Sequence, residues 1–248
     1  MSYVAPDTSY KETTPVCIDH GQHRRKNLGS GGMLELPVLN LRIVVPILGL
    51  LILLSIGAAI QSHFVGDVYV TKNVQSVDAS PWAKVMQLAS VIGSLPVVIA
   101  AASSVMIWFL YKGQRPKSLL VIAAVMTLPI VSVVKELVGR HRPTEEMVTV
   151  WYDLDSLSFP SGHSFTAVVI FGLFFYIAPL LVRSINAVTA IRVASITMIG
   201  LIGMSRVYLG ADWASDVLGG FLYGGVALGF LIYLHRCHIE LSRPRTIP

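Results

Sequence analysis

The stretch FTAVVIFGLFFYIAPLLV, residues 165–182, contains no Asp, Glu, Lys or Arg. A helix needs about 20 residues to cross the roughly 30 Å hydrocarbon core of a bilayer, and this stretch reaches that length with its flanks. Lipid offers no hydrogen-bond partners, so every backbone group of a spanning segment must be paired within it. The stretch therefore predicts a transmembrane helix.

Apolar runs of the same character recur along the chain. They are Ile43–Ile60, Leu95–Tyr111, Leu119–Val134, Val193–Ser205 extended back to about Asn186, and Val217–Leu234. The composition agrees, because 54% of the residues are hydrophobic and 13% are charged, whereas soluble domains carry roughly a quarter charged residues. Disorder, a fibrous repeat and a disulfide scaffold are excluded. We predict an all-α integral membrane bundle of six transmembrane helices.

The positive charges predict the orientation of this bundle. An even number of crossings puts both termini on one side. With the termini inside, only six of the 19 Lys and Arg residues lie outside: Lys72, Lys84, Lys135, Arg140, Arg142 and Arg206. Because cytoplasmic loops carry the excess of Lys and Arg, both termini are predicted to be cytoplasmic, in a plasma or inner membrane. The net charge of +5 then reflects topology, so we expect no nucleic acid partner.

The same reading divides the chain into a polar cytoplasmic arm, residues 1–40, a membrane domain, residues 41–236, and a cytoplasmic tail, residues 237–248. Residues 61–94 lie outside, where Pro81 and Trp82 predict a short amphipathic helix on the membrane surface. Tyr208 and Trp213 are expected at the interface, where aromatic side chains gather.

Two outer cations share one predicted helix end. Lys135 and Arg142 are seven residues apart, about two helical turns, so a continuing helix would place both on one face. Pro143 then ends the helix. Charges at membrane depth are costly and usually mark a functional site, so the pair predicts an anion site. Snorkelling anchors are the simpler alternative, but the outer face is the disfavoured side for them.

A second feature, Pro160-Ser161-Gly162-His163, directly precedes the quoted stretch. Proline and serine are typical of helix starts, and Gly162 would let a ligand approach the backbone. The unpaired N–H groups of a helix N-terminus bind phosphate well. His163, in the first turn, is a candidate proton donor near neutral pH.

A third feature joins Ser205 and Arg206 to Asp212 and Asp216. An arginine can hold phosphate oxygens in a bidentate manner. The two aspartates are four residues apart at a helix start, and they are alternatively interpreted as helix caps. All three features fall at outer helix ends in the six-span topology, which predicts one outward-facing phosphate site.

These residues resemble the type 2 phosphatidic acid phosphatase superfamily of membrane lipid-phosphate phosphatases. Its first motif, Lys-x6-Arg-Pro, is present as Lys135 to Pro143, and its second, Pro-Ser-Gly-His, as Pro160 to His163. Its third, Ser-Arg-x5-His-x3-Asp, runs from Ser205 to Asp216. One position departs, because Asp212 stands where the family has its nucleophilic histidine.

The resemblance implies a phosphatidic acid phosphatase type 2 fold and hydrolysis without a metal or other cofactor. Phosphate would be held by Lys135, Arg142, Arg206 and the backbone around Ser161 and Gly162. His163 would protonate the leaving group, and Asp216 would orient the residue at position 212, which attacks phosphorus.

Asp212 leaves several outcomes open. The carboxylate could form an aspartyl phosphate, the protein could bind lipid phosphate without turnover, or the aspartate could be a deliberate replacement that traps a ligand. The resemblance implies a membrane lipid substrate: phosphatidic acid, phosphatidylglycerol phosphate or polyprenyl pyrophosphate. A non-catalytic lipid-phosphate binder or carrier is the alternative. The oligomeric state is not predicted.

Other residues have simpler interpretations. Arg140 and His141 are expected to be solvated neighbours of the site, and a supporting contact to phosphate is the alternative. Gly220, Gly224, Gly225 and Gly229 form two GxxxG steps that predict close helix packing, either within one chain or between two.

Overall fold

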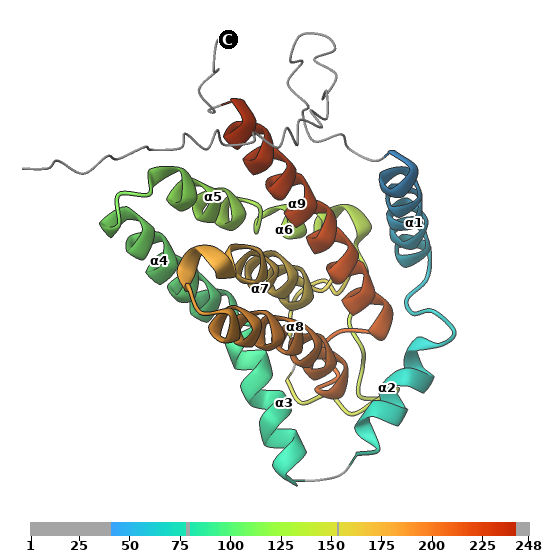
Figure 1. Ribbon diagram of the computed structural model, residues 1–248. Helices are drawn as coiled ribbons and strands as arrows, with labels where there is room; N and C mark the ends of the chain where they lie inside the picture. The colour runs from blue at the N-terminus through green and yellow to red at the C-terminus, as the bar shows by residue number, and fades with distance from the viewer. Residues whose placement is uncertain (1–40, 78–79, 153, 242–248) are drawn as a thin grey trace, which may run out of the picture. The chain divides into compact units, whose positions relative to one another are not determined.

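The computed structural model describes residues 41–77, 80–152 and 154–241 (Figure 1). Every regular element in these ranges is an α-helix, which confirms the all-α class. The predicted arm, residues 1–40, and the end of the predicted tail, residues 242–248, lie outside the described residues. The helices are α1 (Leu41–Ile60), α2 (Asp67–Gln75), α3 (Ser80–Ile92), α4 (Leu95–Tyr111), α5 (Arg115–Met126), α6 (Ile130–Val138), α7 (Gly162–Leu181), α8 (Ile185–Tyr208) and α9 (Ala214–Leu241).

Among the described residues, four stretches are long and apolar enough to cross a membrane. They are Arg115–Val138, which joins α5 to α6, together with α7, α8 and Ala214–Ile239 of α9. Helices α3 and α4 meet at a bend of 58° and make a fifth span if they are counted as one. The apolar part of α1, Val44–Ile60, is shorter. The chain is a multi-pass integral membrane protein, and the count of six spans stays a prediction.

The predicted apolar runs lie on these helices with shifted ends. Leu95–Tyr111 is α4 from end to end. The third run crosses a break between α5 and α6 at Thr127–Pro129. The short fifth run belongs to α8, which is 24 residues long. Helix α9 continues to Leu241, so the tail boundary predicted at residue 236 falls inside a helix.

Helix α7 lies at the centre of the packing and contacts α4, α5, α6, α8 and α9 (Figure 1). Its side chains Ile170, Leu173 and Ile177 are fully buried. Helix α9 approaches α7 closely because it has no side chain at Gly220, where a Cβ would lie 2.5 Å from the carbonyl oxygen of Ser161. This contact positions the start of α7 directly beside α9.

The glycines of α9 differ in what they face. A Cβ on Gly224 would lie 2.9 Å from the carbonyl oxygen of Phe165, whereas Gly225 and Gly229 have nothing within 4 Å. The contact predicted from the GxxxG pattern is therefore made within the chain at Gly220 and Gly224.

The connector after α1 packs against the protein. Met86 of α3 is fully buried with Tyr208 and Leu209, next to the end of α8. Gly93 follows α3, and a Cβ there would lie 2.6 Å from Ile202 of α8. The predicted short helix is present as α3, and one of its faces contacts α8. Its position at the membrane surface stays a prediction.

Candidate functional site

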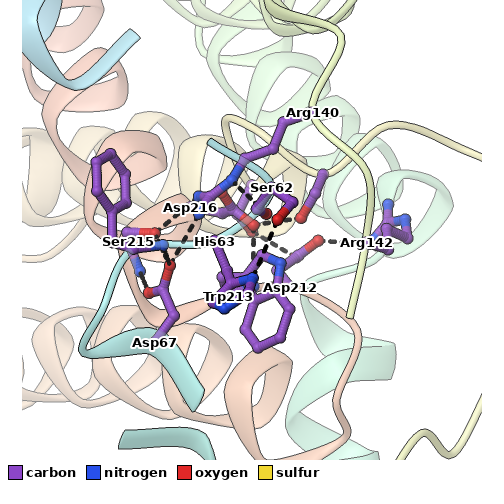
Figure 2. Close-up of polar contacts among 12 residues, drawn as sticks. Ser62, His63, Asp67, Arg140, Arg142, Asp212, Trp213, Ser215 and Asp216 are labelled. Carbon is purple, nitrogen blue, oxygen red and sulfur yellow. Dashed lines mark hydrogen bonds and ion pairs between the residues drawn. The ribbon is translucent and has the colours of Figure 1, made fainter. Parts of the chain in front are cut away.

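The three sequence features meet where α6, α7 and α8 end or begin near the start of α9. Lys135 is on α6, Ser161 precedes α7, and Arg206 is in the last turn of α8. Figure 2 shows the polar contacts on one side of this cluster, with Arg142 reaching Asp212. Side chains 70 or more residues apart thus form one network.

Lys135 and Arg142 reach this region from different backbone. Helix α6 ends at Val138, because Gly139 follows with φ of 67°, the left-handed conformation that stops helices. The predicted continuing helix from Lys135 to Arg142 is therefore wrong. Lys135 donates through Nζ to the carbonyl oxygen of Leu157 at 2.5 Å, and its Cε lies 4.0 Å from the position of a Cβ on Gly162.

All three nitrogens of Arg142 donate hydrogen bonds to acceptors within the protein. Nε donates to the carbonyl oxygen of Ser156 at 2.8 Å, and Nη2 donates to the Ser156 hydroxyl at 2.9 Å. Nη1 donates to the carbonyl oxygen of Ala211 and to Oδ1 of Asp212. Arg142 is thus held between the 156 loop and the turn before α9.

Arg206 is buried, with 4% of its surface exposed, and binds the same aspartate. Its Nε donates to Oδ2 of Asp212 at 3.0 Å, and its Nη1 donates to the hydroxyl of Ser90 on α3 at 3.0 Å. Its Nη2 makes no hydrogen bond within the described residues. A buried guanidinium with a spare nitrogen can still bind an anion.

Asp212 lies between the two arginines. Its Oδ2 also accepts a hydrogen bond from the hydroxyl of Ser161 at 2.8 Å, and 1% of its surface is exposed. Burial alone raises the pKa of the Asp212 carboxyl, but the charges of Arg206, Arg142 and Lys135 outweigh it and hold that pKa below its ordinary value. The carboxylate is therefore an anion bound by the groups that were predicted to bind phosphate.

The start of α7 retains unused donors. Ser161 caps the helix and accepts from the backbone N–H of Ser164 at 3.4 Å. Gly162 and His163 are the first two helical residues, whose N–H groups have no partner inside a helix. The His163 ring makes no hydrogen bond with any described residue. These donors, Nη2 of Arg206 and the remaining protons of Lys135 can still hold a phosphate.

An apolar cavity of about 490 Å³ opens beside His163. It lies between the bend from α3 to α4 and the break from α5 to α6. Its walls are Gly93, Leu95, Ile99, Val125, Met126, Leu128, Pro129, Val131, Ser132, Gly162, His163 and Thr166. A hydrocarbon chain is the kind of group that such walls accommodate.

Asp216 does not contact Asp212. Its Oδ2 accepts from the backbone N–H of Trp213 at 2.9 Å and from the hydroxyl of Ser158. The bond to Trp213 is the helix-start contact expected of an acidic residue in the first turn of α9. Its Oδ1 pairs with Nη1 of Arg140 at 2.5 Å. The capping alternative is therefore confirmed for Asp216, and a direct orienting contact to position 212 is absent among the described residues.

Arg140 contradicts its prediction as a solvated neighbour, because only 2% of its surface is exposed. It forms a second ion pair with Asp67 of α2 at 2.8 Å. Figure 2 shows Asp67 and Asp216 both directed at its guanidinium. The sequence reasoning missed Asp67. The only sequence signal was an acidic residue in the predicted outer connector, on the same side as the unexplained Arg140.

The two aromatic residues predicted at the membrane interface are buried within the protein. Tyr208 is 5% exposed and Trp213 is 2% exposed. The Trp213 ring lies 5.5 Å from the ring of His63, between centroids. No group of three or more His, Cys, Asp or Glu side chains that could hold a metal ion occurs in the described part of the chain.

Comparisons with known proteins show the family and the fold of this chain. The sequence model of the PAP2 superfamily matches residues 116–239. Phosphatidylglycerophosphatase B of Bacillus subtilis (strain 168) is 36% identical over 102 residues, which are 40% of this chain and 48% of that protein. The match thus spans about half the length of that relative.

Two solved structures share the fold. The crystal structure of the first transmembrane PAP2 type phosphatidylglycerolphosphate phosphatase from Bacillus subtilis has a TM-score of 0.62 at 23% identity, covering 82% of this chain and 98% of that chain. Aquifex aeolicus LpxE has a TM-score of 0.53 at 21% identity, covering 69% and 97%. The family match covers half of the chain and includes all three motifs. This membrane protein belongs to the PAP2 superfamily.

Proposed function

We propose that the protein hydrolyses a phosphate or pyrophosphate ester of a membrane lipid, without a metal ion. The observation that carries this proposal is the cluster of Lys135, Arg142 and Arg206 around the start of α7, with His163 beside an apolar cavity. Three fixed cations supply the charge stabilisation that a phosphoryl transfer requires. The family membership supports the same chemistry.

The cavity beside His163 favours a lipid over a soluble ester. A head group bound by Lys135 and Arg206 would leave its hydrocarbon chain against Val131, Leu128 and neighbouring walls. Phosphatidic acid, phosphatidylglycerol phosphate and polyprenyl pyrophosphate all have this form. The relative from Bacillus subtilis is named for phosphatidylglycerophosphate, which makes that lipid the first substrate to test.

The proposed reaction uses side chains and N–H groups that already line the site. Lys135, Arg206 and the N–H groups of Gly162 and His163 hold the phosphoryl oxygens. The Asp212 carboxylate attacks phosphorus, the bond from phosphorus to the lipid oxygen breaks, and His163 gives its proton to that oxygen. Water then attacks phosphorus and gives a proton to His163, the bond from phosphorus to the Asp212 oxygen breaks, and phosphate leaves. Asp212 must release at least one arginine before it can reach phosphorus.

The orientation of the protein in the membrane is also proposed. The site would face the outer side, with both termini cytoplasmic, the membrane domain over residues 41–236 and the lipid entering from the bilayer. The excess of Lys and Arg on the predicted inner side supports this direction.

One observation favours a second candidate, a non-catalytic lipid-phosphate binder or carrier. Both oxygens of Asp212 are hydrogen bonded, to Arg142 on one side and to Arg206 and Ser161 on the other. A carboxylate held in this way is a weak nucleophile. Replacing a nucleophile usually lowers the rate by several powers of ten.

The deciding experiment measures phosphate release from detergent-solubilised phosphatidylglycerol phosphate and phosphatidic acid. The assay compares the parent chain with Asp212→His. The control is Asp155→His, a change in the exposed outer loop. Activity in the parent supports aspartate chemistry, and activity only in Asp212→His identifies a phosphatase site that lacks its nucleophile. If none of the three proteins releases phosphate but the parent still binds lipid phosphate, the hydrolase proposal is wrong and the non-catalytic binder is supported.

A further inference from the structure

Arg140 is a buried arginine outside the proposed phosphate site, and each of its three nitrogens donates a hydrogen bond. Its Nε donates to the carbonyl oxygen of Ser62 at 3.1 Å, and Nη1 donates to the hydroxyl of Ser215 at 2.8 Å as well as to Asp216. Nη2 donates to Asp67, and the guanidinium carbon lies 4.9 Å from the centre of the Phe64 ring. Arg140 therefore joins the segment after α1 to the start of α9.

Asp67 makes the same connection from the other side. Its Oδ1 accepts from the backbone N–H of Ser215 at 2.9 Å, and its Oδ2 accepts from the Ser215 hydroxyl at 2.7 Å. Oδ2 also accepts from the backbone N–H of Phe64 at 2.9 Å. Asp67 is 3% exposed. Buried charges persist only when they are paired and hydrogen bonded, so Asp67 and Arg140 depend on each other.

This pair also acts on the residues that flank Asp212. Asp216, held by Arg140, accepts from the backbone N–H of Trp213, which directly follows Asp212. The carbonyl oxygen of Asp216 accepts from the backbone N–H of Ser161 at 3.0 Å. Ser161 in turn donates to Asp212. Asp216 thus fixes the backbone at Trp213, which follows Asp212, and at Ser161, which bonds to the Asp212 carboxylate.

We propose that Asp67 and Arg140 are positioning residues that hold the 211–216 turn, and with it Asp212, in register with the phosphate site. The proposal rests on the function proposed above. Asp67 precedes residues 116–239, the part that matches the family, so the outer connector of this chain completes a site built from the family motifs. Neither side chain bonds to Lys135, Arg142, His163 or Arg206 in the described structure.

The test compares Asp67→Asn and Arg140→Lys with two matched controls. Asp155→Asn removes the charge of an exposed aspartate, and Arg183→Lys makes the same change as Arg140→Lys at an exposed arginine. Amide hydrogen exchange of the purified proteins in detergent is read over residues 211–217. Phosphate release from the lipid is measured as kcat and KM in the parent, or in the Asp212→His background if only that form is active.

We expect exchange over 211–217 to accelerate at least tenfold in Asp67→Asn and Arg140→Lys and to stay unchanged in both controls. We expect kcat to fall at least tenfold while KM changes less than threefold, because the lipid cavity is untouched. The double variant should lose no more than either single variant, since the two residues act as one unit.

Unchanged exchange over 211–217 in both single variants overturns the proposal. A general defect also overturns it: kcat and KM change to the same extent, and exchange accelerates equally in helices far from the turn. If no form releases phosphate, the proposed function fails, and the exchange result still decides whether the pair holds the turn.

Discussion

The carboxylate of Asp212 accepts a hydrogen bond from Nη1 of Arg142 at 2.5 Å, although the two residues are 70 positions apart in the sequence. Arg206 and Ser161 bind the other oxygen of the same carboxylate. Two arginines and a hydroxyl around one oxyanion are the contacts that a phosphate group would make. Asp212 therefore acts as an internal anion in the site, and an incoming phosphate must compete with it.

Removing the charge at position 212 should strengthen anion binding. In Asp212→Asn the amide keeps the shape of the side chain, but it no longer repels a phosphate or neutralises Arg142 and Arg206. We expect the affinity for inorganic phosphate to rise at least tenfold, which corresponds to about 1.4 kcal/mol. Isothermal titration calorimetry in detergent measures this affinity, with Asp155→Asn as the control. Equal affinities for the parent and Asp212→Asn would contradict the internal-anion interpretation.

The same carboxylate should make the stability depend on pH. The folded-state pKa of Asp212 is lowered. The ionised carboxylate therefore contributes fully to the free energy of unfolding above its unfolded-state pKa of about 3.9. This contribution is lost as the pH falls below that value toward the folded-state pKa. At neutral pH, Asp212→Asn should be less stable by about 3 kcal/mol, because the buried Arg206 and the half-buried Arg142 lose their anion. The difference should narrow between about pH 5 and about pH 3.

Thermal unfolding of the parent and Asp212→Asn in detergent, followed by tryptophan fluorescence across that pH range, measures this narrowing. Other groups titrate in both proteins and cancel in the comparison. A difference in Tm that stays constant or widens on acidification contradicts the assignment of a lowered pKa to Asp212.

The close approach of α7 and α9 gives a prediction about packing. Gly220→Ala places a methyl group 2.5 Å from the Ser161 carbonyl oxygen, so α9 must move away from the start of α7. Overpacking of this kind costs about 1–3 kcal/mol. Gly225→Ala is the matched control, because nothing lies within 4 Å of it, and alanine should be neutral or stabilise the helix by up to about 1 kcal/mol.

Thermal unfolding and the expression yield of folded protein compare the two variants. Since Ser161 bonds Asp212, Gly220→Ala should also lower phosphate binding, whereas Gly225→Ala should not. Equal Tm values for the two variants would show that α7 and α9 are not packed as described.

Local patterns account for what the sequence predicted well. The uncharged runs require helices in lipid, and Ser161-Gly162 at the start of α7 follows from ordinary helix-start preferences. The order and spacing of three motifs were sufficient to identify the family. Each of these inferences depends on residues that are close together in the chain.

Contacts between distant segments were not predictable in the same way. Arg140 and Arg142 are two residues apart and equally charged, yet one is bound by Asp67 and Asp216 and the other by Asp212. Nothing local distinguishes them, because the partners come from other helices. The same reason explains why the contact of α3 with α8 was not predicted. The end of α6 at Gly139 was missed because the spacing of Lys135 and Arg142 fitted a helix.

His163 provides the most direct test of the proposed chemistry. His163 is one of the residues that line the apolar cavity, where it can meet the oxygen that joins a lipid to its phosphate. General acid catalysis contributes about 10²–10⁴-fold, so His163→Ala should lower kcat at least 100-fold while the affinity for inorganic phosphate stays within about threefold. His141→Ala is the matched control, since His141 is exposed and close in sequence to Arg142. Phosphate release and phosphate binding are measured on the same preparations, in whichever form of position 212 is active. Turnover that survives in His163→Ala contradicts the assignment of the proton donor. A parallel loss of turnover and phosphate affinity would instead make His163 a binding group.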